Sequence, residues 1–157
     1  MNTELDLTFT RVVDVKPELV WRAWTTPEYL VKWFTPAPWK TVHAEVDLTP
    51  GGKFHTVMES PEGQRFPNTG CYLEVVPNRK LVWTGALLAG YRPANLGADV
   101  PFVFTAIIEL EPSGAGTTYT ATVMHSTADG RQKHEAMGFH TGWGKALDQL
   151  IALAKTM

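Results

Sequence analysis

Apolar and polar residues alternate along much of the first 125 positions, and this pattern predicts a series of short strands. Residues 5–15 show the period-two alternation first. Runs with the same period are then separated by Pro, Gly, Asn and Ser residues, which are typical of turns. These signals predict further strands over residues 40–48, 53–59, 70–76, 80–86, 102–111 and 117–125. Residues 87–101 hold two glycines and two prolines, and we expect a long loop there.

Three segments have helical spacing instead. Pro17 and Pro27 stand at first-turn positions and predict short helices over residues 18–25 and 27–34. From about residue 131 to residue 155, apolar residues fall on one stripe of a helical wheel, which predicts a single long amphipathic helix. The stripe consists of Ala136, Phe139, Trp143, Leu147, Leu150, Ile151 and Ala154.

A long amphipathic helix must bury its apolar stripe, and the inward face of the sheet offers the only large apolar surface. The expected order is one strand, two short helices, six strands and one long helix. We therefore predict an α+β fold in which a curved antiparallel sheet of about seven strands wraps around a C-terminal helix. A chain of 157 residues fits one domain, which we place at residues 1–157.

Charge and cysteine content narrow the classes of partner. The net charge is −2 and no cluster of Lys and Arg stands out, so we expect no nucleic-acid partner. Cys71 is the single cysteine, which excludes an internal disulfide and a cysteine metal cage and favours the cytoplasm. The N-terminus lacks a signal-peptide pattern, and no apolar run reaches the length of a membrane span. We expect neither a metal nor a cofactor.

Six tryptophans are many for a chain of this length, and they serve either as ordinary core or as the wall of an apolar pocket. If the helix leaves room beneath the sheet, the inward residues surround a cavity for a small hydrophobic or aromatic molecule. The expected lining is Trp24, Trp33, Phe54, Met58, Leu73, Trp83, Phe104, Tyr119, Phe139, His140 and Trp143.

The histidines separate by the face on which each falls. His43, His55 and His134 are assigned to polar faces, whereas His125 and His140 share a face with apolar residues. A buried histidine needs a partner, so these two are either hydrogen-bonded core residues or groups that orient or deprotonate a ligand. Rise per residue along helix and strand places His140 near Tyr119 and away from His125. The candidates for acid–base chemistry are thus His140, Tyr119 and His125.

Two motifs of the C-terminal segment fail on spacing. His134-Glu135 lacks the second histidine that a zinc helix needs four residues later, because position 138 is Gly. Gly144-Lys145 lacks the remainder of a phosphate-binding loop. Gly138, Gly142 and Gly144 each cost a helix about 1 kcal/mol relative to Ala. They indicate either close packing against a neighbour or a bend that makes room for a ligand.

Four stretches of sequence resemble one known superfamily. They are Val20–Glu28, Asp47–Phe54, Gly70–Thr84 and Gly138–Trp143. These residues resemble the helix-grip fold of the START and birch-pollen-allergen (SRPBCC) superfamily. They are most similar to bacterial single-domain homologues of the C-terminal domain of the heat-shock-chaperone ATPase activator. The resemblance extends from about Thr8 to Leu153.

The resemblance implies a fold more strongly than a function, because this fold hosts carriers, cyclases and co-chaperone domains. Binding of a small apolar ligand is the function that we favour. The alternatives are a cyclase- or aromatase-type enzyme that uses a cavity His or Tyr, and a protein-interaction module that acts on a chaperone in the stress response. Ligand identity, turnover and a homodimeric state are left open by the sequence.

Overall fold

A bent antiparallel sheet dominates the computed structural model, which describes residues 2–97 and 100–157. Its seven strands follow the order β1-β9-β8-β5-β4-β3-β2, and every pair is antiparallel. The strands are β1 (Asp6–Val13), β2 (Lys40–Val46), β3 (Lys53–Glu59), β4 (Arg65–Val76), β5 (Lys80–Thr84), β8 (Phe104–Ser113) and β9 (Gly116–His125). The predicted α+β class and the seven-stranded antiparallel sheet are confirmed.

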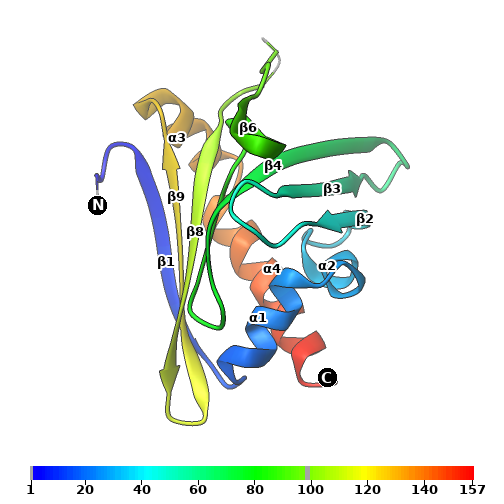
Figure 1. Cartoon of the computed structure of the whole chain (residues 1–157), viewed down its shortest axis with the longest axis vertical. Helices are drawn as coiled ribbons and strands as arrows, with labels where there is room; N and C mark the ends of the chain where they lie inside the picture. The colour runs from blue at the N-terminus through cyan, green and yellow to red at the C-terminus, as the bar shows by residue number, and fades with distance from the viewer. Residues whose placement is uncertain (1, 98–99) are drawn as a thin grey trace.

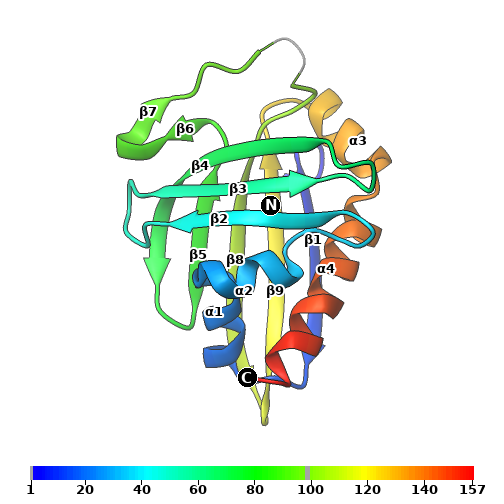
Figure 2. The same cartoon turned by 90° about the vertical axis from the view of Figure 1, so that its right-hand side faces the viewer.

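Helices lie on the concave side of this sheet. They are α1 (Pro17–Thr25), α2 (Pro27–Trp33), α3 (Ala128–Ala136) and α4 (Phe139–Ala154). Figures 1 and 2 show β2, β3 and β4 running across the direction of β1, β9 and β8, with α4 passing through the angle between the two groups. Helices α1 and α2 pack against each other and against α4, and so close one end of the bend.

Strand β4 makes the turn in the sheet. It is twelve residues long, and its pairing with β5 shifts register between Tyr72 and Glu74. A bulge of this kind adds one unpaired residue and bends the strand. The alternation predicted for residues 70–76 fails at the bulge, because Cys71 and Tyr72 are both buried and Leu73 is only half-buried.

The predicted start of β4, at residue 70, is five residues too late. Pro67 and Asn68 have turn-like character in the sequence but lie within the strand. This first half of β4 pairs with β3 alone, because pairing with β5 begins only at Cys71. Proline is tolerated where a strand has one free edge.

The predicted loop over residues 87–101 contains a small second sheet. Strands β6 (Leu87–Leu88) and β7 (Arg92–Pro93) pair across a 3-10 turn formed by Ala89–Tyr91. Such short strands carry little period-two signal, so the sequence pattern could not reveal them.

The prediction of a single C-terminal helix is wrong. Gly138 adopts φ +94° and separates α3 from α4. This left-handed conformation is inexpensive only for glycine, so the residue ends one helix and begins the next at a new angle. The break also alters which residues face inward. His134 is buried, contrary to its predicted polar face, whereas His140 is exposed, contrary to its predicted apolar face.

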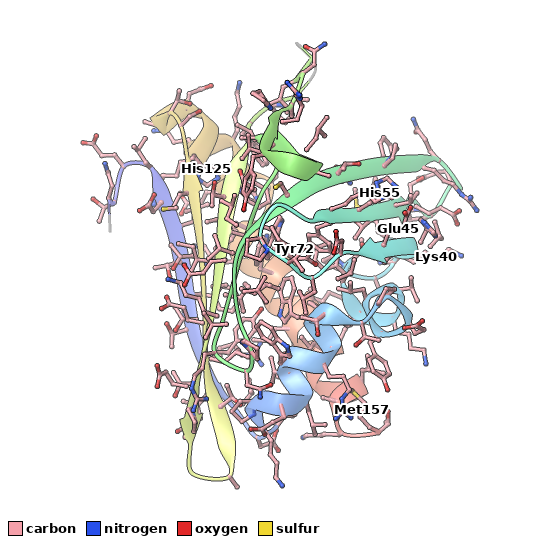
Figure 3. All side chains as sticks on the ribbon, viewed as in Figure 1. Lys40, Glu45, His55, Tyr72, His125 and Met157 are labelled. Carbon is pink, nitrogen blue, oxygen red and sulfur yellow. The ribbon has the colours of Figure 1, made fainter. Side chains whose placement is uncertain are left out.

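Charged residues gather on the outer side of β2 and β3. Glu45 accepts a hydrogen bond from Lys53 Nζ at 2.6 Å and lies 2.9 Å from His43 Nε2. Figure 3 shows Glu45 and His55 along these strands and Tyr72 inside the bend. The outer face of β1 and β9 carries threonine pairs instead, Thr8 with Thr122 and Thr10 with Thr120.

Candidate functional site

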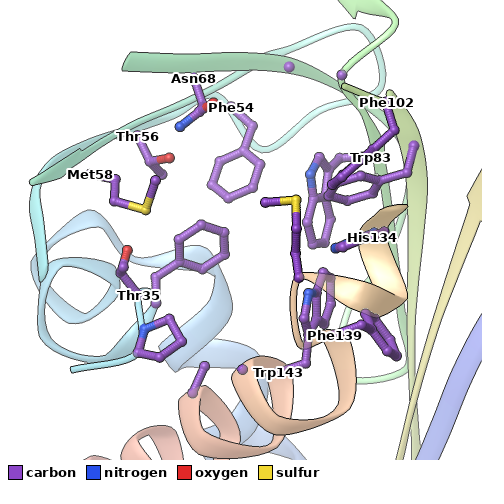
Figure 4. Close-up of a pocket in the computed structure, with 18 of the residues that line it drawn as sticks. Thr35, Phe54, Thr56, Met58, Asn68, Trp83, Phe102, His134, Phe139 and Trp143 are labelled. Atoms are coloured by element: carbon purple, nitrogen blue, oxygen red, sulfur yellow. The ribbon is translucent and has the colours of Figure 1, made fainter. Parts of the chain in front are cut away.

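A cavity of about 680 Å³ lies between the concave side of the sheet and helix α4 (Figure 4). Pockets that hold small molecules usually measure roughly 300–1,000 Å³. Residues of α1, α2, β3, β4, β5, β8, β9, α3 and α4 line the cavity. The C-terminal helix therefore crosses the sheet without filling the space beneath it.

Interlocked aromatic rings form one wall. Trp24 of α1 meets Trp33 of α2 edge-on at 4.7 Å between ring centroids and meets Trp83 of β5 at 5.1 Å. Phe54 of β3 then meets Trp83 edge-on at 5.3 Å. Contacts of this geometry add to the stability that burial already gives. Contacts among these side chains therefore hold the wall in shape.

Trp143 of α4 forms part of the opposite wall. Its ring is nearly parallel to that of Trp83, at 9° and 6.4 Å between centroids. The ring also lies 5.3 Å from the ring of Phe139. Trp143 is only half-buried, because one side of its ring faces the cavity. Trp143 therefore lies at the boundary of the cavity and is not fully packed in the core.

The polar groups of the lining are neutral at pH 7. Besides the indole N–H groups of the tryptophans, they come from Thr35, Thr56, Asn68, Thr69, Tyr119 and His134. Among the lining residues that the structure describes, none is Asp, Glu, Lys or Arg. Burying an unpaired charge in such surroundings costs many kcal/mol. The cavity therefore suits an uncharged molecule.

The structure brings most of the predicted lining residues together around the cavity. They are Trp24, Trp33, Phe54, Met58, Trp83, Phe104, Tyr119, Phe139 and Trp143. Leu73 and His140 lie outside it, so their predicted places in the lining are wrong. The β4 bulge moves Leu73 out of register with its inward neighbours. The side chain of His140 is 56% exposed, and its Nε2 lies 3.7 Å from the carboxylate of Glu135.

Several lining residues have no counterpart in the prediction. Phe34, Phe102, Met137 and His134 all contact the cavity. Phe34 directly follows the last residue of α2, and Phe102 lies two residues before β8, so both stand just outside the regular elements into which the pattern had placed them. His134 and Met137 depend on the break at Gly138. Glycine at three nearby positions was the signal in the sequence that could have indicated this break.

Two buried histidines are joined at one end of the cavity. His125 Nδ1 donates to the carbonyl oxygen of Leu5 at 2.8 Å, and His125 Nε2 lies 2.9 Å from His134 Nδ1. The His134 ring stacks on Phe102, at 4.3 Å and 19°. Burial, followed by the nearby His125, lowers the pKa of His134 to about 4. His134 is therefore neutral at pH 7.

Of the three candidates for acid–base chemistry, only Tyr119 lines the cavity. Its hydroxyl oxygen accepts a hydrogen bond from Trp24 Nε1 at 3.2 Å. Burial raises the pKa of the Tyr119 phenol above its ordinary value, so this group keeps its proton. The hydrogen-bond partner of Tyr119 is Trp24, whereas His140 faces Glu135.

Within residues 2–97 and 100–157, no group of three or more His, Cys, Asp and Glu residues could hold a metal ion. The helices of the same residues include none that is both long and apolar enough to cross a membrane.

A bent antiparallel sheet around a C-terminal helix, with an apolar cavity between them, defines the helix-grip class of α+β proteins. The sequence matches the family described as activator of Hsp90 ATPase homolog 1-like protein over residues 14–155. The chain belongs to this family, which confirms the resemblance noted in the sequence.

Solved structures agree with this assignment. Protein NE0264 from Nitrosomonas europaea is 52% identical, with a TM-score of 0.93 over 99% of this chain and 97% of that one. Protein CV1439 from Chromobacterium violaceum is 26% identical, with a TM-score of 0.77 over 95% and 96% of the two chains. A Rhodobacter sphaeroides protein at 22% identity shares the fold, with a TM-score of 0.85 over 100% and 97%. No curated protein matches the chain in sequence.

Proposed function

We propose that this protein binds a small, uncharged, mainly aromatic molecule in the cavity between the sheet and α4. The observation that carries the proposal is the cavity of about 680 Å³, whose described lining is apolar and free of charged side chains. A ligand there would replace water against tryptophan and phenylalanine rings, which is the main source of affinity in such pockets.

The entrance supports the same proposal. Met137, Leu96 and Val100 line the cavity and are also 70%, 44% and 44% exposed. They therefore stand where the cavity meets solvent. Large apolar side chains left exposed around an opening are typical of a route for apolar molecules.

Helix α4 offers a variant that fills the cavity and a matched control. Gly142 lines the cavity, and a Cβ added there would have Pro36 Cγ as its nearest neighbour, at 3.9 Å. Gly144 lies two residues later, is not part of the lining, and a Cβ there would meet open space. Gly142→Leu thus introduces a side chain at the cavity wall, whereas Gly144→Leu makes the same chemical change outside it.

The test is titration of the wild type and both variants with 2-naphthol, followed by calorimetry and by chemical shifts of the indole N–H groups. We expect the wild type and Gly144→Leu to bind, with shifts concentrated at Trp24, Trp83 and Trp143. We expect Gly142→Leu to bind at least about tenfold more weakly, because a leucine occupies the space. Equal binding by all three proteins, or no binding by the wild type, would overturn the proposal.

The two alternative functions have less support. The candidates for acid–base catalysis were His140, Tyr119 and His125, but the two histidines lie outside the cavity and Tyr119 retains its proton. A chaperone-binding module would be favoured by a large exposed apolar patch on the outer face of the sheet. On β1 and β9 that face carries the threonine pairs described above. The cytoplasmic location and the partners remain predictions.

A further inference from the structure

The His125–His134 pair gives one end of an otherwise apolar cavity a defined hydrogen-bonding character. We propose that the cavity selects hydroxylated aromatic molecules, whose O–H group donates a hydrogen bond to Nε2 of His134. This inference rests on the proposed function and specifies the chemical class of its ligand.

The Leu5 carbonyl fixes the position of the proton on His125. A carbonyl oxygen can only accept a hydrogen bond, so the 2.8 Å contact with the Leu5 carbonyl requires the proton of His125 to be on Nδ1. In a neutral imidazole the other nitrogen then carries a lone pair. Nε2 of His125 is therefore an acceptor.

Because Nε2 of His125 is an acceptor, it also fixes the proton of His134. Its Nδ1 lies 2.9 Å from the acceptor Nε2 of His125, so Nδ1 must carry the proton of the His134 ring. The remaining nitrogen, Nε2, then carries a lone pair. A backbone carbonyl thus fixes the tautomers of two side chains in series, in the same way that outer partners fix histidine tautomers at other sites.

The lone pair on Nε2 of His134 faces the cavity. His134 is only 8% exposed, lines the cavity, and points a ring nitrogen into it in Figure 4. Within the described residues, the hydrogen bond to His125 is the only one that the His134 ring makes. Figure 4 also shows Thr35, Thr56 and Asn68 across the cavity from His134, so their hydroxyl and amide groups do not serve Nε2.

The ring has little freedom to turn away. It stacks on Phe102 and lies 5.0 Å from the ring of Phe104 and 5.3 Å from that of Phe139. An acceptor held among aromatic rings is left unmatched by a hydrocarbon, an ether or a ketone, because none of them has a proton to donate. An alcohol or phenol of the same size satisfies it.

Three probes of similar shape test the inference: 2-naphthol, 2-methoxynaphthalene and naphthalene. We expect the wild type to bind 2-naphthol about tenfold more tightly than either of the other two, which is the usual effect of one buried hydrogen bond. The three dissociation constants are measured by calorimetry on the full chain.

Two variants test the roles of the two ring nitrogens of His134 one at a time. In His134→Asn, the amide nitrogen replaces Nδ1 and can still donate to His125, but nothing replaces Nε2. In His134→Gln, the longer amide places a polar group near the position of Nε2. We expect the preference for 2-naphthol to disappear in His134→Asn and to persist in His134→Gln.

The outcomes distinguish this inference from the proposed function. If all three probes bind the wild type with equal affinity, or if His134→Asn keeps the preference, the hydroxyl inference fails and cavity binding stands. If no probe binds, both fail. The ¹⁵N chemical shifts of the free wild type give an independent test. We expect a protonated Nδ1 and an unprotonated Nε2 for His134, and the reverse assignment would overturn the inference.

Discussion

The indole nitrogen of Trp24 lies 3.2 Å from the hydroxyl oxygen of Tyr119, and this hydrogen bond joins helix α1 to strand β9. Both side chains are buried and both line the cavity. The bond ties the helices that close one end of the bend to the strand next to the β1 edge of the sheet. It therefore helps to keep the cavity from collapsing, and its loss has a measurable cost.

The substitution Tyr→Phe should have opposite effects at the two fully buried tyrosines. Tyr119→Phe leaves the Trp24 N–H buried without an acceptor, so we expect the free energy of unfolding to fall by about 1–3 kcal/mol. Tyr72 stacks on Phe54, and its hydroxyl has no hydrogen-bond partner among the described residues. Tyr72→Phe should be neutral or stabilise by up to about 1 kcal/mol.

Urea denaturation of both variants checks this prediction, and a double-mutant cycle with Trp24→Phe isolates the bond. We expect a coupling of about 1 kcal/mol between Trp24 and Tyr119. Equal destabilisation at positions 72 and 119, or additive effects of Trp24→Phe and Tyr119→Phe, would contradict it.

Alanine should be unfavourable at Gly138 and favourable at Gly144. Gly138 has φ +94°, where a Cβ strains the backbone, so Gly138→Ala should destabilise by about 1–2 kcal/mol even though no atom lies within 4 Å of the new Cβ. Gly144 lies inside α4 with equally free space, and Gly144→Ala should stabilise by up to about 1 kcal/mol. Thermal and urea unfolding measure both effects, and a change of the same sign at both positions would refute this account.

Trp143→Ala should cost less stability than Leu150→Ala, although tryptophan is much larger. Leu150 is fully buried on the same helix and lies outside the cavity, so its truncation should cost about 2–5 kcal/mol. Trp143 already faces the cavity on one side, and we expect a loss of only about 1–2 kcal/mol because fewer packing contacts are lost.

The same variant should also accept larger ligands, because the cavity gains the volume of the indole ring. Calorimetry with 1-pyrenol and 2-naphthol would show a gain for the larger probe relative to the wild type. A stability loss above that of Leu150→Ala would instead indicate that Trp143 belongs to the packed core.

Lowering the pH should reduce the free energy of unfolding in two separate windows. The window of His134 lies at higher pH than the window of the carboxylates. The pKa of His134 falls from 6.5 to about 4 on folding, so the unfolded chain binds more protons between these values. The free energy of unfolding therefore decreases as the pH is lowered through this window, by up to about 3 kcal/mol, and is unaffected by this group above it. Unfolding free energies measured at intervals from pH 7.5 to pH 4 test the effect.

The carboxylates act in a lower window. The pKa of Glu45 is lowered from 4.5 to about 2 by hydrogen bonds from Lys53 and then His43, so its contribution is lost only below about pH 4.5. His134→Asn should therefore flatten the stability profile between pH 6.5 and pH 4.5 and leave the steeper fall below it. A variant with the same slope as the wild type above pH 4.5 would rule out His134 as the cause.

Patterns that extend over many residues predicted the fold correctly. The alternation in residues 5–15 and 117–125 and the apolar stripe of residues 139–154 each repeat a signal often enough to fix both the element and its buried face. The inward residues Phe54, Trp83 and Tyr119 follow directly from such runs, which is why they could be predicted for the lining. The predictions of element boundaries and of inward faces failed where a single residue interrupts a pattern.

The failures at His134, His140 and Leu73 share one cause. Each depends on a local irregularity, the break at Gly138 or the bulge after Tyr72, that shifts every neighbouring side chain to a different face. One glycine or one extra strand residue leaves hardly any trace in a periodic pattern. Its conformation is selected by the free energy of packing the whole chain.

The sequence by itself therefore determined the seven long strands and their order along the chain, the two short helices, the α+β class and the aromatic character of the interior, because these depend on local spacing and composition. Only the tertiary structure decided that α4 leaves a cavity, that no charged side chain of the described lining faces it, and that His134 and not His140 presents a nitrogen to it. Those features depend on the angle between elements far apart in the chain, and that angle is fixed by packing across the bend of the sheet.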